Sequence, residues 1–383
     1  MQIEILAIGD ELLEGSVINT NAAYISSVLG KAGYTCSFQQ VIGDHLHKGI
    51  AWIQAAFSRA DLVFLTGGLG PTQDDLTRAM LAEIFSIEPL LYKNPAGVEP
   101  AQVYTQNGKM LIALPGVPKE LYALFPGEIL PKVEAFFPKE HVLSTKELCI
   151  GGKKEVDVDA YVRKLSRTYP SVKIGIYPSL GTLRLLFSTK DSADTLDAFV
   201  LAVESAYFSY VFSHKGESIQ EAFHAVCREK QLTIAFAESC TGGALGAAIT
   251  ELPGASSYFL GSIVAYSEDM KKRYLDVSKK TLFHQGAVSI ETVEEMATSL
   301  KNNSSADYVA AVSGMLGSLK EEAQSTISAG KVAICIHSPK QLFSGWIQAP
   351  KNRNSGIEYT VHFVLFSLWR LITQGKPPEF HGI

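Results

Sequence analysis

The chain has 383 residues, of which 46% are hydrophobic and 19% are charged, and its formal net charge is -5. This length favours two or three domains, and the apolar fraction is sufficient for packed cores, which excludes a wholly disordered chain. The mild acidity argues against a general nucleic-acid-binding protein, because such proteins attract the phosphate backbone with a net positive surface.

The cysteines and the first residues favour a reduced, cytoplasmic protein. The five cysteines are scattered and include no CxxC pair, which argues against both a disulfide framework and a zinc site. The first eleven residues, MQIEILAIGDE, carry three acidic side chains where a secretory signal would be apolar. No stretch approaches the ~18 uninterrupted apolar residues of a membrane helix. We therefore expect neither a membrane nor a nucleic acid as a partner.

The first part of the chain alternates short apolar runs with helix-like patterns. Strands are expected at residues 3–8, 36–42, 62–65 and 110–114, with helical patterns between them. This alternation is typical of a parallel sheet that helices cover on both faces. We therefore predict an α/β domain over residues 1–143.

The rest of the chain divides into two further parts. Residues 144–215 offer short strands and two helices, which predicts a small α+β domain. Its basic residues are interleaved with acidic ones, which favours a solvated face over a nucleic-acid patch. Residues 216–383 resume the α/β alternation and close with an apolar helix near 357–371. The predicted fold class is thus α/β, with two α/β sheet domains separated by a small α+β domain.

Glycine-rich and acidic segments follow two of the strands predicted in the first domain. Ligands of open α/β sheets bind beyond the carboxyl ends of the strands, where glycines let backbone amides approach a phosphate. Carboxylates at the same edge are suited to a hard cation such as Mg²⁺ or another divalent ion. The alternative for Asp74 and Asp75 is that they only stabilise the first turn of a helix. The candidate metal ligands are Asp10, Glu11, Asp74 and Asp75.

The sharpest feature of the last domain is the segment AESCTGG, residues 237–243. Ser239 stands where a strand is expected to end and a helix to begin, and its simplest role is to cap that helix. The alternative is a nucleophile, with the following amides as an oxyanion site and a desolvated lysine, Lys271 or Lys272, as its base. Cys240 is the rival nucleophile, and His284 is its candidate partner.

Together these segments resemble the competence/damage-inducible CinA family. GDELLEG (9–15), NTNAAY (19–24), TGGLGPTQDDLT (66–77) and LPGVPKEL (114–121) resemble its molybdopterin-biosynthesis-like domain. AESCTGG (237–243), ELPGASSYFLGSIVAYSEDMK (251–271) and GAVS (286–289) resemble its nicotinamide-nucleotide amidase domain. The middle part resembles the family only in its position along the chain and in its pattern of short strands and helices. A small KH-like domain is expected at this position.

The resemblance implies an amidase without a required cofactor in the last domain. It would hydrolyse nicotinamide mononucleotide to nicotinate mononucleotide and ammonia in pyridine-nucleotide salvage. Ser239 would be the nucleophile and Lys271 its base, with Tyr266 orienting the lysine or relaying its proton. The other residues implied in ligand binding are, in the last domain, Cys240, Thr241, Gly242, Gly243, Ser313, Gly314 and Arg353, and in the first domain, Gly67, Gly68, Gly70, Thr77, Pro115 and Gly116.

The resemblance also implies a homo-oligomer and, in the first domain, a metal-dependent pyrophosphatase acting on ADP-ribose. The sequence departs from the family pattern in the loop at 313–322, which lacks a proline and later glycines, and in the short segment at 91–103. Ile357 stands where a second arginine is common, and Asn19 replaces an aspartate. These departures favour a competing hypothesis, a degenerate member that binds a nucleotide or a protein partner without turnover. The loop GGLGPTQDD (67–75) alone supports a third hypothesis, a pterin-binding protein of molybdenum-cofactor assembly.

Overall fold

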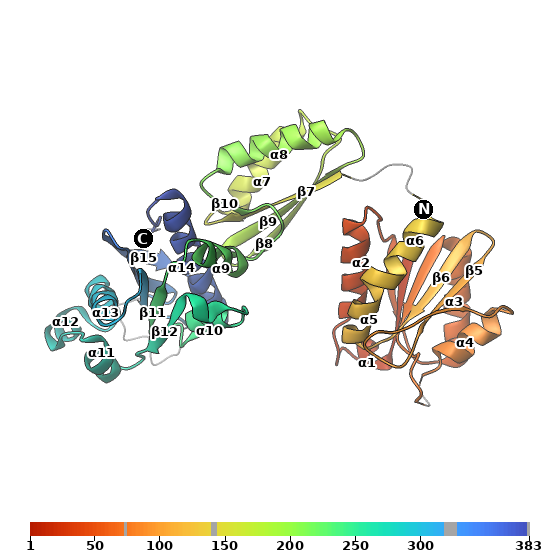
Figure 1. Cartoon of the computed structure of the whole chain (residues 1–383), viewed down its shortest axis with the longest axis horizontal. Helices are drawn as coiled ribbons and strands as arrows, with labels where there is room; N and C mark the ends of the chain where they lie inside the picture. The colour runs from red at the N-terminus through yellow and green to blue at the C-terminus, as the bar shows by residue number, and fades with distance from the viewer. Residues whose placement is uncertain (73–74, 139–143, 318–327, 381–383) are drawn as a thin grey trace. The chain divides into compact units, whose positions relative to one another are not determined.

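The structure is a computed structural model that describes residues 1–72, 75–138, 144–317 and 328–380. The contacts within the chain divide it into two units, Met1–Ser144 and Thr145–Ile383. In Figure 1 the first unit runs from red to yellow and the second from yellow through green to blue. The division lies at residue 144, where the sequence pattern places the start of the middle domain.

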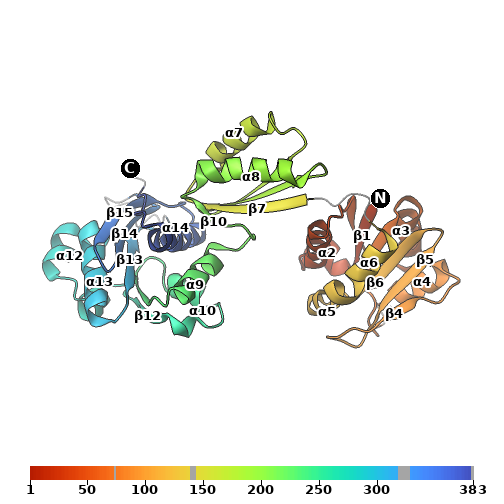
Figure 2. The same cartoon turned by 45° about the horizontal axis from the view of Figure 1, so that its top comes forward.

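The first unit is built on one six-stranded sheet, visible edge-on in Figure 2. The strand order is β2-β1-β3-β6-β5-β4; the first four are parallel, and β5 and β4 extend the sheet antiparallel. Residues of β1 and β3 are buried throughout because helices cover both faces. The strands are β1 (Ile3–Ile8), β2 (Phe38–Ile42), β3 (Leu62–Thr66), β4 (Leu90–Tyr92), β5 (Ala101–Gln106) and β6 (Lys109–Leu114).

Alternate residues of these strands serve two separate cores. Ile3 and Ile5 point to one core, whereas Leu6 and Ile8 belong to the other, as the twofold period of a strand requires. The first face is covered by α2 (Thr20–Lys31), α5 (Pro118–Leu124), the π-helical segment η1 (Phe125–Ile129) and α6 (Leu130–Phe136). The second face is covered by α3 (Leu46–Arg59) and α4 (Thr77–Ile84), and a short α1 (Asp10–Leu13) follows β1.

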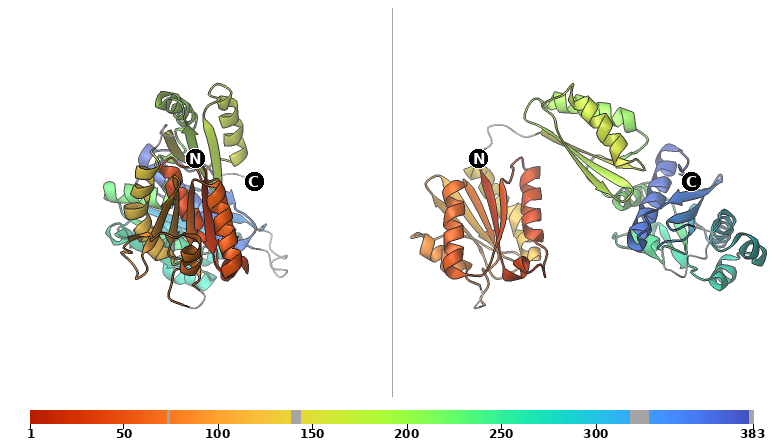
Figure 3. Two further views of the ribbon diagram at one scale, coloured as in Figure 1. Left: turned by 90° about the vertical axis from the view of Figure 1, so that its right-hand side faces the viewer. Right: turned by 180° about the vertical axis from the view of Figure 1, so that it is seen from behind.

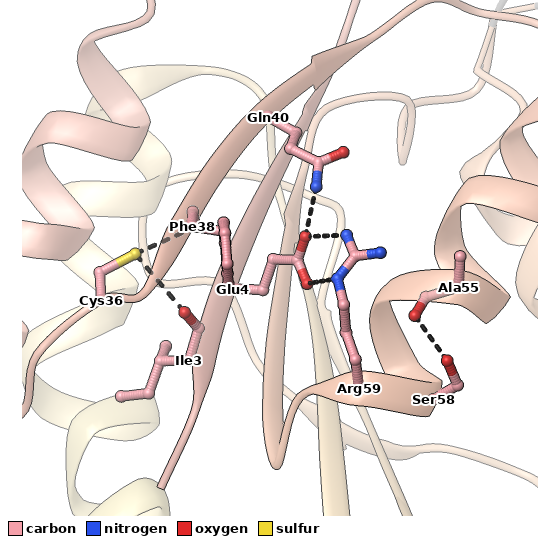
Figure 4. A network of polar contacts seen from close by, with 8 residues as sticks. All are labelled: Ile3, Glu4, Cys36, Phe38, Gln40, Ala55, Ser58 and Arg59. Atoms are coloured by element: carbon pink, nitrogen blue, oxygen red, sulfur yellow. Dashed lines mark hydrogen bonds and ion pairs between the residues drawn. The ribbon is translucent and has the colours of Figure 1, made fainter.

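A buried carboxylate ties α3 to the sheet (Figure 4). Glu4 on β1 is fully buried, and its carboxylate accepts hydrogen bonds from the Arg59 guanidinium, with the Nε contact at 3.0 Å. Gln40 on β2 donates a third hydrogen bond to it, over 2.5 Å. The charge is therefore paired and hydrogen-bonded, the condition under which burial of a carboxylate is tolerated.

The second unit begins with a four-stranded sheet in the order β10-β7-β9-β8. Two helices pack on it through a core that includes Val158, Leu185 and Phe199. Figure 3 shows both helices on one side of this sheet. Its elements are β7 (Ser144–Gly151), α7 (Glu155–Ser166), β8 (Lys173–Ser179), β9 (Thr182–Thr189), α8 (Ala193–Tyr207) and β10 (Val211–Ser213).

A five-stranded sheet follows in the same unit, in the order β12-β11-β13-β14-β15. The first three strands are parallel, and β14 and β15 are antiparallel to their neighbours. One face packs on α9, α10 and α14, and the other on α11, α12 and α13. The elements are α9 (Ile219–Glu229), β11 (Ile234–Glu238), α10 (Ala244–Thr250), η2 (Ala255–Ser257), β12 (Phe259–Val264), α11 (Glu268–Leu275), α12 (Lys279–Gln285), α13 (Ile290–Asn303), β13 (Tyr308–Gly314), β14 (Lys331–His337), β15 (Leu342–Gln348) and α14 (Arg353–Gln374).

The predicted fold class is confirmed: along the chain, the α+β sheet comes between two α/β sheets. The four strands predicted for the first sheet are parallel to one another, as expected, and the hairpin of β5 and β6, which turns at Asn107 and Gly108, adds antiparallel strands that were not predicted. The predicted strand at 36–42 begins only at Phe38. Within the part of the chain described, no helix is long and apolar enough to cross a membrane. All five cysteines are free thiols.

Candidate active site

The candidate site of the second unit lies at the carboxyl ends of three parallel strands. Glu238, the last residue of β11, pairs in register with Val264 of β12 and Val312 of β13. The residues that follow these strands therefore meet at one edge of the sheet, as expected for ligand sites of open α/β sheets. Ser239 follows β11 directly.

Lys271 on α11 reaches Ser239 across this edge. Its Nζ lies 2.7 Å from Ser239 Oγ, 2.8 Å from the carbonyl oxygen of Ala265 and 3.3 Å from that of Tyr266. The Lys271 side chain is only 1% exposed and Ser239 only 6%. Within the part of the chain that the structure describes, no carboxylate forms an ion pair with Lys271, so its charged form is poorly compensated.

This burial changes the protonation of the lysine. Desolvation lowers the pKa of Lys271 from 10.5 to about 8, against the opposing influence of Cys240 and Glu268. A neutral amine has two N–H groups and one lone pair. The two carbonyl oxygens can receive the N–H groups, which leaves the lone pair facing the Ser239 hydroxyl. The contacts of Lys271 thus match a base that withdraws a proton from Ser239.

The rival assignments have different surroundings. Burial raises the pKa of the Cys240 thiol to about 12, so that it stays protonated near neutral pH. His284 is exposed on α12 and packs against the ring of Phe283 rather than against Cys240. Lys272 points to the surface, where it pairs with Asp269 over 2.5 Å. Of these groups, Lys271 and Ser239 are the two that the fold brings together.

Ser239 does not cap the helix that follows it. α10 begins at Ala244, and its N-cap is Gly243, in a left-handed conformation with φ of 100°. The turn between them is held instead by the carboxylate of Glu238, which is fully buried and accepts hydrogen bonds from Thr241 Oγ1 and Ser262 Oγ. The strand pattern alone assigns no role to Glu238, although an acidic residue at the end of an apolar strand, shortly before two glycines, is a signal for such a buried carboxylate.

Tyr266 and Arg353 form the exposed rim of the site. The Tyr266 hydroxyl accepts a hydrogen bond from Arg353 Nη2 over 2.7 Å, whereas only the backbone carbonyl of Tyr266 contacts Lys271. Arg353 Nη1 donates to the carbonyl of Leu316 over 2.9 Å. No carboxylate pairs with Arg353 within the residues described, so its charge is available to an anion.

The end of β13, the third strand at this edge, carries Ser313 and Gly314, which pack against neighbouring segments of the chain. Ser313 is fully buried, and its Oγ donates to the carbonyl of Ala287 over 2.7 Å. Gly314 packs so closely on β14 that an added Cβ would lie 2.7 Å from the Val332 side chain. The remainder of the atypical 313–322 loop, from residue 318 onward, lies outside the described residues.

The first unit carries a cavity of about 760 Å³ at the carboxyl ends of β1, β3 and β6. Its lining includes most of the residues that the sequence analysis assigned to ligand binding. Thr77 is an exception. Its hydroxyl is buried and donates a hydrogen bond to the carbonyl of Gly67 over 2.8 Å, so it supports the glycine-rich loop and does not line the cavity. The lining residues that match the assignment are Glu11, Gly67, Gly68, Gly70, Asp75, Pro115 and Gly116.

Asn21 on α2, which stands in the NTNAAY segment but was assigned no role from the sequence, holds two of these loops together. Its Nδ2 donates to Thr66 Oγ1 over 2.9 Å and to the carbonyl of Gly116 over 2.7 Å. The Asn21 side chain therefore fixes the end of β3 against the turn after β6. Its signal in the sequence was an amide residue in the first turn of a helix next to the glycine-rich segments.

The candidate metal ligands do not form a cluster among the residues described. The Asp75 carboxylate accepts a hydrogen bond from the backbone N–H of Thr72 over 2.9 Å. Burial raises the pKa of Asp75, but the hydrogen bonds from Thr72 and from the backbone of Gly70 have the larger combined effect, so the pKa is lowered. Asp10 is exposed and contacts the backbone of Asp44 over 3.3 Å. Asp74 lies outside the described residues, and within them no three acidic, histidine or cysteine side chains are placed to hold a metal ion.

Comparison with known proteins matches both sheet domains to family models. Residues 216–372 match the model described as the CinA C-terminal domain, and residues 4–135 match that described as a probable molybdopterin binding domain. A CinA-like protein of Kosmotoga olearia is 31% identical over 357 residues, which cover 83% of this chain and 86% of the relative. A CinA-like protein of Dictyoglomus thermophilum is 30% identical over the same shares of the two chains.

Solved structures of similar proteins cover single parts of the chain. A competence or damage-inducible protein from Enterobacter asburiae is 26% identical and covers 41% of this chain and 100% of its own, with a TM-score of 0.39. The molybdopterin biosynthesis enzyme MoaB of Thermus thermophilus is 19% identical and covers 36% of this chain and 97% of its own, with a TM-score of 0.31.

Proposed function

Because the chain belongs to the CinA family, we propose that its last domain is an amidohydrolase that converts nicotinamide mononucleotide to nicotinate mononucleotide and ammonia. The observation that carries the proposal is the buried contact of 2.7 Å between Lys271 Nζ and Ser239 Oγ. It supplies a nucleophile together with a base whose pKa, about 8, lies near neutral pH. Such a pair is suited to an unreactive acyl group such as a carboxamide.

The reaction divides into two halves. In the first, Ser239 Oγ attacks the amide carbon while its proton moves to neutral Lys271, and the resulting ammonium gives that proton to the leaving nitrogen, releasing ammonia. In the second, water attacks the acyl-serine ester while Lys271 takes a proton from the water. The proton then returns to Ser239 Oγ as the ester bond breaks, so the product is the nicotinate carboxylate with its own proton released to solvent. No metal ion or cofactor enters either half.

Arg353 and Tyr266 are the groups we assign to the nucleotide end of the substrate. The Arg353 guanidinium is exposed, and no described carboxylate neutralises it, so it can bind a phosphate through charge-assisted hydrogen bonds. The Tyr266 side chain is 60% exposed and is held by Arg353, which leaves its ring face open to a ligand. We therefore assign phosphate binding to Arg353 and substrate packing to Tyr266.

Ammonia release from nicotinamide mononucleotide tests the amidase directly. We expect turnover by the unmodified chain, loss to background in Ser239→Ala, and near-normal turnover in Ser257→Ala, which removes an exposed serine elsewhere in the domain. Cys240→Ser tests the rival nucleophile, because retained turnover in this variant would show that the Cys240 thiol does not attack the amide carbon. An unmodified chain that binds the nucleotide without releasing ammonia would instead support the degenerate, regulatory alternative.

A second candidate function rests on the cavity of the first unit. Its volume of about 760 Å³ and the glycine loops that line it are suited to a nucleotide such as ADP-ribose. Because the described residues do not form a metal site, we propose ligand binding there and derive no hydrolytic step. Calorimetric titration with ADP-ribose, with and without Mg²⁺, tests binding, and release of AMP would extend the proposal to the pyrophosphatase. Asp75→Ala provides the variant in which binding should weaken.

A further inference from the structure

Glu238 is an acidic residue buried directly before the proposed nucleophile. Its side chain is 0% exposed, at the end of β11, which lies between β12 and β13 in the sheet. Burying a carboxylate in this way is costly unless every lone pair is satisfied. The mechanism proposed above makes no use of this charge, which raises the question of what it does.

The Glu238 carboxylate is enclosed by five hydrogen-bond donors. One oxygen, Oε2, accepts from Thr241 Oγ1 at 2.8 Å and from the backbone N–H groups of Gly243 and Leu245, each at 3.0 Å. The other, Oε1, accepts from the N–H of Gly246 at 3.0 Å and from Ser262 Oγ at 2.6 Å. Three backbone amides converging on one anion is an arrangement that proteins commonly use for phosphates. Here the chain's own side chain fills it.

Two consequences follow for the turn at 239–243. The amides of Gly243, Leu245 and Gly246 are occupied, and the negative charge repels a second anion, so the substrate phosphate is excluded from this turn. By contrast, the N–H groups of the two residues after the nucleophile are not used by the turn: among the residues that the structure describes, that of Cys240 contacts only its own thiol sulfur, and that of Thr241 donates to no acceptor. An N–H next to a nucleophilic serine commonly stabilises the oxyanion of the tetrahedral intermediate.

We infer that Glu238 is a positioning residue: by accepting hydrogen bonds from the turn, from α10 and from β12, it fixes Ser239 against Lys271 and leaves the N–H groups of Cys240 and Thr241 available for the oxyanion of the substrate. This inference rests on the proposed amidase function and assigns a role to a residue that does not touch the substrate. It also assigns a role to the Gly242–Gly243 turn. That turn forms the support for the nucleophile and does not receive the phosphate of the nucleotide.

The test compares three substitutions at one position. Glu238→Gln keeps the shape but loses the charge, Glu238→Asp keeps the charge on a shorter stem, and Glu238→Ala empties the site. We expect Glu238→Gln and Glu238→Ala to lower kcat for nicotinamide mononucleotide by about 10- to 100-fold with KM changed less than about threefold, because oxyanion stabilisation acts on the transition state. Glu238→Asp should retain more activity than Glu238→Gln.

Chemical rescue separates positioning from a general effect on folding. Formate is small enough to replace the missing carboxylate in Glu238→Ala, so about 0.1 M sodium formate should raise kcat several-fold, while the same concentration of sodium chloride should not. A loss of activity caused only by partial unfolding would lower the active fraction and would not respond to formate specifically. Ser262→Ala removes one donor from β12 and leaves the amides bound, so it should cost less than Glu238→Gln.

Acylation of Ser239 by p-nitrophenyl acetate, followed as the burst of nitrophenolate, provides a readout that does not depend on the natural substrate. The inference predicts slower acylation in Glu238→Gln even if nicotinamide mononucleotide is not the substrate, so its outcome is separate from that of the proposed function. Unchanged kcat and unchanged acylation in folded Glu238→Gln would overturn the inference. Should Glu238→Ala fail to fold, Glu238→Gln and Glu238→Asp still decide it.

Discussion

Arg353 Nη2 and the Tyr266 hydroxyl are joined by a hydrogen bond of 2.7 Å, although the two residues lie 87 positions apart in the chain. The contact connects the first residue of α14 with the segment between β12 and α11, which also carries the carbonyl groups that bind Lys271. The group we assign to the phosphate is therefore linked through one tyrosine to the backbone around Lys271, the proposed base.

Arg353→Gln should weaken substrate binding with little effect on the chemical step. A hydrogen bond between charged groups contributes about 1.5–3 kcal/mol, so KM for nicotinamide mononucleotide should rise about 10- to 100-fold while kcat stays within about threefold. Nicotinamide riboside, which lacks the phosphate, is the matched control substrate, and its kcat/KM should be nearly the same in both proteins. Equal losses with the two substrates would show that Arg353 does not bind the phosphate.

Activity should depend on pH through Lys271. With a pKa of about 8, the Lys271 side chain is a charged ammonium below pH 8 and a neutral amine above it. Only the neutral amine can accept the proton of Ser239. The kcat/KM for nicotinamide mononucleotide should therefore rise tenfold per pH unit below pH 8 and level off above it. A profile that is flat between pH 6 and 9, measured on protein shown to stay folded throughout, would exclude Lys271 as the base.

The same pKa predicts a change of stability in a different pH window. In the unfolded chain a lysine titrates near 10.5, so between pH 8 and 10.5 the unfolded state binds more protons than the folded state. Stability must therefore rise with pH across this window, by about 3 kcal/mol at most. Below pH 8 both states are protonated and the contribution is constant.

Lys271→Met provides the reference for this measurement, because methionine fills a similar volume and does not titrate. Other groups, including tyrosines and thiols, ionise in the same range in both proteins. The difference between the two urea-unfolding free energies, followed from pH 7.5 to 10, should move in favour of the unmodified chain. If the difference stays constant with pH, the lysine is not desolvated in the folded protein.

The sequence pattern alone does not decide whether Lys271 or Lys272 contacts Ser239. Strand patterns correctly place β11 and β12, whereas α11 is short and polar and is not predicted. Neighbouring residues of a helix point in directions about 100° apart, so one of the two lysines is buried beside Ser239 while the other lies at the surface. Without the start of α11, only the resemblance to a known family distinguishes them.

Glu238 shows a second limit. Its position at the end of an apolar strand favours burial, but its role depends on donors from a turn, a helix and the adjacent strand. The interaction with Ser262 spans 24 residues and exists only because β12 pairs with β11. Periodicity predicts the strands, and chain folding decides which polar groups meet at their ends.

Arg59→Met should destabilise the first unit because it leaves the fully buried Glu4 carboxylate without its counter-charge. We expect a melting temperature several degrees lower, measured by differential scanning calorimetry. The double variant Glu4→Gln with Arg59→Met removes both charges and should recover part of the loss. A double variant that is less stable than Arg59→Met would show that the charge on Glu4 is not the source of the effect.

Gly67→Ala should remove ligand binding in the first-unit cavity. Gly67 has a φ of 105°, and an added Cβ would lie 2.2 Å from the carbonyl oxygen of Ile8, so the loop must move away from β1. Gly108→Ala is the matched control: its φ is 74°, but no atom lies within 4 Å of the added Cβ, so only the backbone cost of about 1 kcal/mol applies. ADP-ribose binding should be lost in Gly67→Ala and retained in Gly108→Ala, because only the first substitution displaces backbone that lines the cavity. Crystals of Gly67→Ala with an undisturbed loop and unchanged affinity would contradict the close packing on which this expectation depends.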